Sequence, residues 1–150
     1  MRALILVVLV GCVERTAPPF DPPPGLQPPA ALGCTRGSAC ASDEVCARDG
    51  ECLPPDQVRA VHIDWTVSGA AASDTTCSAA PVLRLDLSSS TGGGHLGFAP
   101  VPCAEGKFSI DVLPIAFDHV ALGSSLGFEQ AAIDPATGEA TLDLPYGARP

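Results

Sequence analysis

Apolar and polar residues alternate along much of the chain from Val58 onward, and this pattern constrains the fold most strongly. Three runs carry apolar residues at every second position: Val61, Ile63, Trp65 and Val67; Leu83, Leu85 and Leu87; and Phe108, Ile110 and Val112. Successive side chains of a β-strand point to opposite faces, so each run predicts a strand with one buried face. Glycine and proline interrupt the region often, and no amphipathic helical pattern emerges. The sequence therefore predicts an all-β fold, a small antiparallel β-sandwich over residues 58–147 with Trp65 in its core.

Further strands are expected towards the C-terminus. After Pro114 the alternation continues through Ile115, Phe117 and His119, and two late apolar runs cover residues 126–133 and 140–144. The late runs are separated by Asp-Pro-Ala-Thr-Gly, which combines three residue types that favour turns. We expect the two late strands to form a β-hairpin.

A short segment before these strands contains four cysteines with five residues between neighbours: Cys34, Cys40, Cys46 and Cys52. Val45 is its one sizeable apolar side chain, so residues 33–55 cannot bury a core and need covalent support. Two disulfides would each contribute about 3 kcal/mol. Zinc is the competing interpretation, but zinc sites favour cysteines two to four residues apart, and an oxidising compartment would oxidise the thiolates. We therefore predict disulfides and no metal.

The pairing within this segment is open, because four cysteines allow three connectivities. An interlocked pair braces a short segment better than two separate rings, which favours Cys34–Cys46 with Cys40–Cys52. The other two cysteines, Cys77 and Cys103, lie after the Trp65 run and before the Phe108 run. A disulfide between them would close about 27 residues and contribute roughly 3.5 kcal/mol.

The chain begins with an apolar run over residues 3–10, preceded by Arg2 and ending in Leu-Val-Gly-Cys at residues 9–12. The run is far shorter than the roughly 20 residues that span a bilayer, but it fits the core of a signal peptide. Residues 9–12 resemble the lipobox of bacterial lipoproteins. The resemblance implies that residues 1–11 are a signal peptide removed before Cys12, whose sulfur then carries a diacylglycerol. The alternative is an ordinary signal peptide with Cys12 beside the cleavage site.

The leader that this cleavage would release is shorter than the usual range of about 15–30 residues, which a start codon further upstream would explain. Val13 follows the cysteine where a retention signal would have Asp, and in the sorting rule of such lipoproteins this favours the outer membrane. The expected location is thus the cell envelope, with the protein held to the membrane through its N-terminal lipid.

The cysteine count and the next segment agree with this interpretation. The chain has seven cysteines, an odd number that in an exported protein leaves one thiol over. If Cys12 carries lipid, the other six can all pair. Residues 12–32 are rich in proline, favour extended polyproline II and predict a disordered linker between the lipid and the folded part. A docking site for a proline-binding module is the weaker alternative, since most such modules are cytoplasmic.

Two resemblances extend the prediction. Asp43-Glu44 before the third cysteine and Gly50 near the fourth resemble the small four-cysteine repeat of exported lipoproteins of the myxobacterial type. That resemblance implies a small surface element held together by disulfides, and it implies no known activity. The order of Trp65, Cys77, Cys103 and the Phe108 strand resembles transthyretin-like or carboxypeptidase-regulatory-like sandwiches. An immunoglobulin order would place the tryptophan between the two cysteines, whereas Trp65 precedes both.

The charge of the chain excludes some partners. Lysine and arginine total 8, aspartate and glutamate total 17, and the net charge is −9. Removal of residues 1–11 takes away Arg2 and makes the mature protein more acidic still. Such a protein repels nucleic acid, so no nucleic-acid partner is expected. Asp43, Glu44, Asp49 and Glu51 are candidate calcium ligands, but acidic residues in solvated loops are commoner than calcium sites.

The sequence contains no catalytic signature. The three histidines, His62, His95 and His119, have no ligand spacing among them. His62 is expected to face solvent and His95 to lie in a flexible loop after three glycines. Asp118 and His119 are neighbours, so on a strand they would point apart and could not form a dyad directly. One of Ser88, Ser89 and Ser90 could join His95, but no Gly-x-Ser-x-Gly elbow is present.

We therefore expect no enzyme, no catalytic residue and no cofactor. The predicted function is a non-catalytic structural or binding module of the cell envelope, whose partner is an envelope protein or a glycan. A carbohydrate-binding module is the first alternative. It needs an exposed aromatic platform, so a buried Trp65 that does not respond to glycans would count against it. A protease inhibitor acting through an exposed loop at residues 47–51 is the second alternative.

Overall fold

The computed structural model describes residues 33–34 and 40–145. Cys12, the predicted signal peptide and the predicted linker lie outside these residues. The described residues form strands, turns and two short 3-10 helices, η1 (Pro55–Gln57) and η2 (Cys103–Glu105). No helix in this part of the chain is long and apolar enough to cross a membrane. The predicted all-β fold is confirmed.

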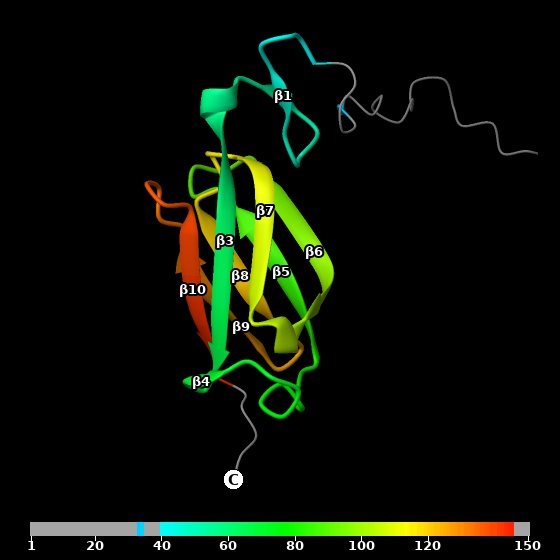
Figure 1. Cartoon of the computed structure of the whole chain (residues 1–150), viewed down its shortest axis with the longest axis vertical. Helices are drawn as coiled ribbons and strands as arrows, with labels where there is room; N and C mark the ends of the chain where they lie inside the picture. Colours follow the sequence, from blue (N-terminus) through cyan, green and yellow to red (C-terminus); the bar gives the residue numbers. More distant parts are fainter. Residues whose placement is uncertain (1–32, 35–39, 146–150) are drawn as a thin grey trace, which may run out of the picture. The chain divides into compact units, whose positions relative to one another are not determined.

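The strands after η1 form two sheets that face each other as a sandwich (Figure 1). In the first sheet the long central strand is flanked by two others and extended by a two-residue strand: β3 (Val58–Val67), β10 (Glu139–Leu144), β7 (Lys107–Pro114) and β4 (Ala70–Ala71). The second sheet has four antiparallel strands in the order β6 (His95–Pro102), β5 (Val82–Ser88), β8 (His119–Ser124) and β9 (Gly127–Ala132). One pair departs from the antiparallel pattern, because β10 runs parallel to β3.

Two of the predicted alternations are confirmed in full. The apolar residues of these two predicted runs, which lie in β3 and β5, are at most 3% exposed and belong to the core: Val61, Ile63, Trp65, Val67, Leu83, Leu85 and Leu87. The indole Nε1–H of Trp65 donates a hydrogen bond to the carbonyl of Cys103 at 2.9 Å. The largest aromatic side chain is thus buried with its one polar atom satisfied, as packing of an indole requires.

The third alternation fails at its last position, because β7 contains a bulge. Val61 pairs with Ile110 and Arg59 pairs with Leu113, so two residues of β7 lie opposite one residue of β3. Val112 takes the extra position with φ 58°, a left-handed conformation that is uncommon for a β-branched residue. Leu113 is therefore the buried residue, and the prediction that Val112 continues the core face was wrong.

The region after β7 also differs from the prediction. Residues 115–118 form a turn in which Ile115 is 51% exposed and Phe117 is buried, so no strand runs through them. His119 instead begins β8, whose inward residues are Val120 and Leu122. His95 begins β6 and does not lie in a flexible loop, so that prediction was wrong too.

The late turn forms as predicted, but the hairpin does not. The carboxylate of Asp134 accepts hydrogen bonds from the N–H groups of Ala136 and Thr137 at 2.8 and 2.9 Å. Gly138 has φ 73°, and a Cβ there would lie 2.3 Å from the carbonyl oxygen of Ala60. However, β9 pairs with β8 and β10 pairs with β3, so the turn carries the chain from one sheet to the other.

Candidate functional site

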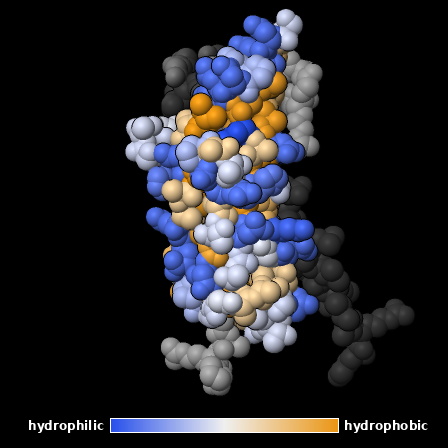
Figure 2. Space-filling model, turned by 60° about the vertical axis from the view of Figure 1, so that its left-hand side comes forward, coloured by the Kyte–Doolittle hydropathy of each residue, from blue (hydrophilic) through white to orange (hydrophobic). Residues whose placement is uncertain are grey.

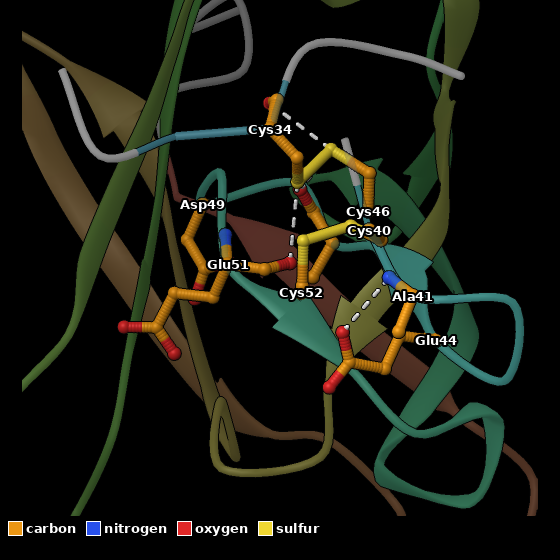
Figure 3. Close-up of a disulfide and its surroundings, with 9 residues drawn as sticks. Cys34, Cys40, Ala41, Glu44, Cys46, Asp49, Glu51 and Cys52 are labelled. Carbon is orange, nitrogen blue, oxygen red and sulfur yellow. Dashed lines mark hydrogen bonds between the residues drawn. A yellow bond between two sulfur atoms is a disulfide. The ribbon is translucent and has the colours of Figure 1, made fainter. Parts of the chain in front are cut away.

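The four-cysteine segment is closed by two interlocked disulfides, Cys34–Cys46 and Cys40–Cys52 (Figure 3). The favoured connectivity is confirmed. Within the segment that the two disulfides close, β1 (Val45–Cys46) and β2 (Cys52–Leu53) pair as a short antiparallel ribbon. The sulfurs of Cys34, Cys40 and Cys52 lie within 4.8 Å of one another. Cysteine binds metals as the thiolate, and each of these sulfurs is bonded to another sulfur instead.

The acidic residues of the segment stabilise its turns. A carboxylate oxygen of Glu44 accepts a hydrogen bond from the N–H of Ala41 at 3.3 Å, and Asp49 accepts one from the N–H of Glu51 at 3.2 Å. Figure 3 shows the bond between Ala41 and Glu44 beside the disulfides. Side-chain oxygens of Asp and Glu commonly satisfy turn donors in this way.

The bulge in β7 supplies the contacts between the segment and the sandwich. The backbone N–H of Arg48 donates to the carbonyl of Val112 at 3.1 Å, and its Nε donates to the carbonyl of Asp111 at 3.3 Å. The segment and the strands accordingly belong to one compact unit. Ala47 is 4% exposed, so the loop at residues 47–51 lies partly against the strands. Arg48, Asp49 and Glu51 of the same loop are exposed.

The third disulfide, Cys77–Cys103, is buried in the sandwich with its residues 2% and 0% exposed. It ties the loop after β4 to η2, as the sequence predicted. All six cysteines of the described residues are therefore paired.

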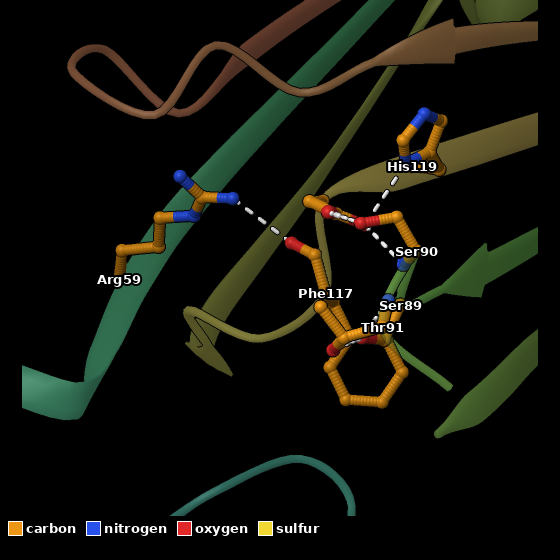
Figure 4. Close-up of polar contacts among 7 residues, drawn as sticks. Arg59, Ser89, Ser90, Thr91, Phe117 and His119 are labelled. Carbon is orange, nitrogen blue, oxygen red and sulfur yellow. Dashed lines mark hydrogen bonds and ion pairs between the residues drawn. The ribbon is translucent and has the colours of Figure 1, made fainter. Parts of the chain in front are cut away.

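One cluster of serine, aspartate and histidine lies where β5 ends and β8 begins (Figure 4). Asp118 accepts hydrogen bonds from the N–H of Ser90 at 2.8 Å and from its hydroxyl. The Nδ1 atom of His119 lies 2.8 Å from Asp118 Oδ1, the oxygen that also accepts from the N–H of Ser90. The prediction that Asp118 and His119 point apart was wrong, because Asp118 precedes the first residue of β8 and is not subject to strand alternation.

This cluster has the wrong order for nucleophilic catalysis. A serine nucleophile needs the histidine between itself and the carboxylate, so that the imidazole can take the hydroxyl proton. Here the carboxylate of Asp118 contacts both Ser90 and His119. Ser89 bonds to Thr91 instead, at 2.9 Å. The cluster closes a turn, and the hydrogen bonds from His119 and then Ser90 hold the pKa of Asp118 well below its usual range.

Acid should destabilise the fold through three such carboxylates. A hydrogen bond from His119 lowers the pKa of Asp118. A hydrogen bond from the Thr137 backbone lowers the pKa of Asp134, and one from the Gly69 backbone lowers the pKa of Asp143. A folded-state pKa below the unfolded value gives stability that is present above about pH 4 and is lost as the pH falls further. Urea unfolding at pH 7, 4 and 2.5 should therefore show a decreasing free energy of unfolding.

The Asp143→Asn variant should show a weaker pH dependence over the acidic range than the wild type. Asp64→Asn is the matched control, since Asp64 is an exposed carboxylate on the same sheet. Equal acid sensitivity of the Asp143→Asn variant and the wild type would refute this account of Asp143.

A second polar group lies on the outer face of the second sheet. Asp86 on β5 contacts Arg84 Nε at 2.8 Å and His95 Nε2 at 3.2 Å, and its side chain is 17% exposed. Beside it is a hollow of about 380 Å³, lined by Asp86, Ser88, His95, Ala121, Phe128 and Gln130. The register places Ser88 opposite His95, but among the described residues the imidazole of His95 contacts Asp86 and makes no side-chain hydrogen bond with Ser88.

Sequence reasoning missed Arg84, Asp86, Phe128 and Gln130 as members of one group. The alternation of β5 places Arg84 and Asp86 on the outer face, and this signal was available. The sequence could not indicate the register that brings β6, β8 and β9 beside them, because that register depends on strand pairing. The face shown in Figure 2 mixes hydrophilic and weakly apolar residues, and the most apolar side chains gather towards its upper end.

Comparisons with protein-family models, with curated proteins and with solved structures found no match to this chain.

Proposed function

We propose that the mature protein is a lipid-anchored, non-catalytic binding module of the cell envelope. The observation that carries the proposal is the pairing of the cysteines. Three disulfides use six of the seven cysteines, and Cys12 has no cysteine left to pair with in its own chain. Disulfides are typical of exported proteins, and lipidation would account for the remaining sulfur.

Binding is favoured over catalysis by the polar groups on the surface. The serine, aspartate and histidine near β8 are in an order that cannot activate the serine, and the disulfides of the cysteine segment occupy its sulfurs. A stapled sandwich is a rigid support for a recognition surface. The partner classes that we propose are an envelope protein or a glycan, and the net charge of −9 argues against nucleic acid.

The anchor can be tested by fractionating cells that express the wild type or Cys12→Ala. A diacylated cysteine holds a protein firmly to a bilayer, because one chain binds marginally and two bind stably. We expect the wild type in the membrane fraction and in the detergent phase, and the variant in the soluble fraction.

Val13→Ala is the matched control, since it alters the neighbouring residue and keeps the sulfur. It should remain in the membrane fraction. If Cys12→Ala stayed with the membranes as completely as Val13→Ala, the lipid anchor would be refuted.

A further inference from the structure

We propose that the outer face of the β6–β5–β8–β9 sheet binds an uncharged glycan chain across the hollow beside Asp86. This inference rests on the proposed function in one respect, since it names the partner class of a binding module. It does not depend on the lipid anchor, because the face lies wholly within the sandwich.

Strand register brings polar and small residues of four strands together on this face. Gly97, Asp86, Ala121 and Gln130 are successive cross-strand partners from β6 to β9. Ala121 has only a methyl group and lies between Asp86 and Gln130, so the row is low between these two polar side chains. The resulting hollow of about 380 Å³ falls within the usual size range of ligand sites.

An exposed aromatic ring stands at one side of the hollow. Phe128 on β9 is 47% exposed, and it is the one aromatic residue among the four large apolar side chains that are exposed in the described residues. Its cross-strand partner is Gly123, which has no side chain with which to cover the ring. The apolar C–H faces of sugar rings pack on such rings. Trp65 cannot provide this platform, because it is 3% exposed in the core.

The charges at the hollow favour an uncharged ligand. The carboxylate of Asp86 already lies 2.8 Å from the guanidinium of Arg84, so its charge is compensated within the protein. A charged ligand would have to compete with this pair, whereas a hydroxyl group can donate to Asp86 and accept from Arg84 without breaking it.

The remaining polar groups suit a ligand with several hydroxyls. Gln130 and Ser88 line the hollow, and their side chains make no hydrogen bond to the other described residues. An amide and a hydroxyl can each donate and accept, as sugar hydroxyls do. All of these residues are on paired strands, so their backbone positions are fixed before a ligand arrives.

The test uses the full chain carrying Cys12→Ala, which needs no detergent whether or not the wild type is lipidated. Soluble neutral oligosaccharides of glucose, xylose, mannose and N-acetylglucosamine are titrated by calorimetry and by amide NMR shifts. At least one should bind, with shifted amides concentrated at Asp86, Ala121, Phe128 and Gln130. Phe128→Ala and Gln130→Ala should each weaken that binding at least tenfold.

Val82→Ala is the matched control. Val82 is 55% exposed on the same sheet and does not line the hollow, so this variant should bind as the parent does. Unchanged thermal unfolding would show that each variant is folded. The proposal is overturned if no oligosaccharide binds, if Phe128→Ala binds undiminished, or if acidic polygalacturonate binds more tightly than every neutral ligand.

The glycan-binding proposal and the lipid-anchor proposal can be refuted independently of each other. A wild-type protein that is not lipidated can still bind glycans through this face, which would leave the present proposal standing. A lipidated protein that binds none of the oligosaccharides would refute the glycan site and leave the anchor intact.

Discussion

Replacing Trp65 with alanine is expected to lower the free energy of unfolding by about 3–5 kcal/mol. The indole is 3% exposed between the two sheets, and its removal leaves a cavity among residues that cannot all move to fill it. The substitution also leaves the Cys103 carbonyl without the hydrogen bond that it accepts at 2.9 Å. Urea denaturation followed by far-ultraviolet circular dichroism measures the change.

Two further variants test whether that loss of stability comes from the contacts that Trp65 makes in the core. Trp65→Phe keeps most of the apolar contact but no N–H, so its effect should lie between those of the wild type and the alanine variant. Asp64→Ala changes the adjacent exposed residue and should stay within about 0.5 kcal/mol of the wild type. A Trp65→Ala effect as small as that of Asp64→Ala would mean that Trp65 does not lie in the core.

Removing the buried disulfide with Cys77→Ala and Cys103→Ala together should cost about 3.5 kcal/mol by the loop-entropy estimate. The bridge joins residues separated by 26 positions and ties the loop after β4 to the helical turn before β7. Without it, the unfolded chain gains conformational freedom while the strands keep their own hydrogen bonds. The midpoint of urea unfolding should fall accordingly.

The matched comparison is Cys40→Ala with Cys52→Ala. This disulfide joins residues separated by 12 positions within the cysteine segment, outside the two large sheets. Its loss should loosen the segment and change the unfolding of the sandwich by less than the loss of Cys77–Cys103. An equal or larger effect on the sandwich would contradict the assignment of Cys77–Cys103 as its main covalent support.

The sequence identified strands where alternation was strong and uninterrupted. Val61 to Val67 and Leu83 to Leu87 have apolar residues at every second position, and both runs are buried strands. β6 was missed because glycine and proline interrupt it at Gly97, Pro100 and Pro102. These residues are tolerated there because β6 is at the edge of its sheet, where a lost backbone donor costs little.

Local patterns could not specify which strands would pair. The turn at residues 134–138 has the residues of a tight turn, and it is one, yet it joins strands of different sheets. The same limit applies to Val112, since the alternation through Phe108 and Ile110 contains no sign of the bulge that turns Leu113 inward. Both outcomes depend on contacts with β3, which is distant in sequence.

The candidate site was predicted less well than the fold for the same reason. Cysteine pairing could be argued from spacing, and the structure has the favoured connectivity. The group around Asp86 combines side chains from four strands, and only the register places Phe128 and Gln130 near it. By its residue type, a phenylalanine such as Phe128 is expected in the core. The structure instead has it on β9, at the edge of a sheet.

The most direct test of the proposed function is the intact mass of the protein extracted from membranes. A mature chain that begins at Cys12 and carries a diacylglycerol on that residue, with six further cysteines oxidised, is the predicted result. A chain that retains residues 1–11, or one that begins elsewhere and carries no lipid, would contradict it.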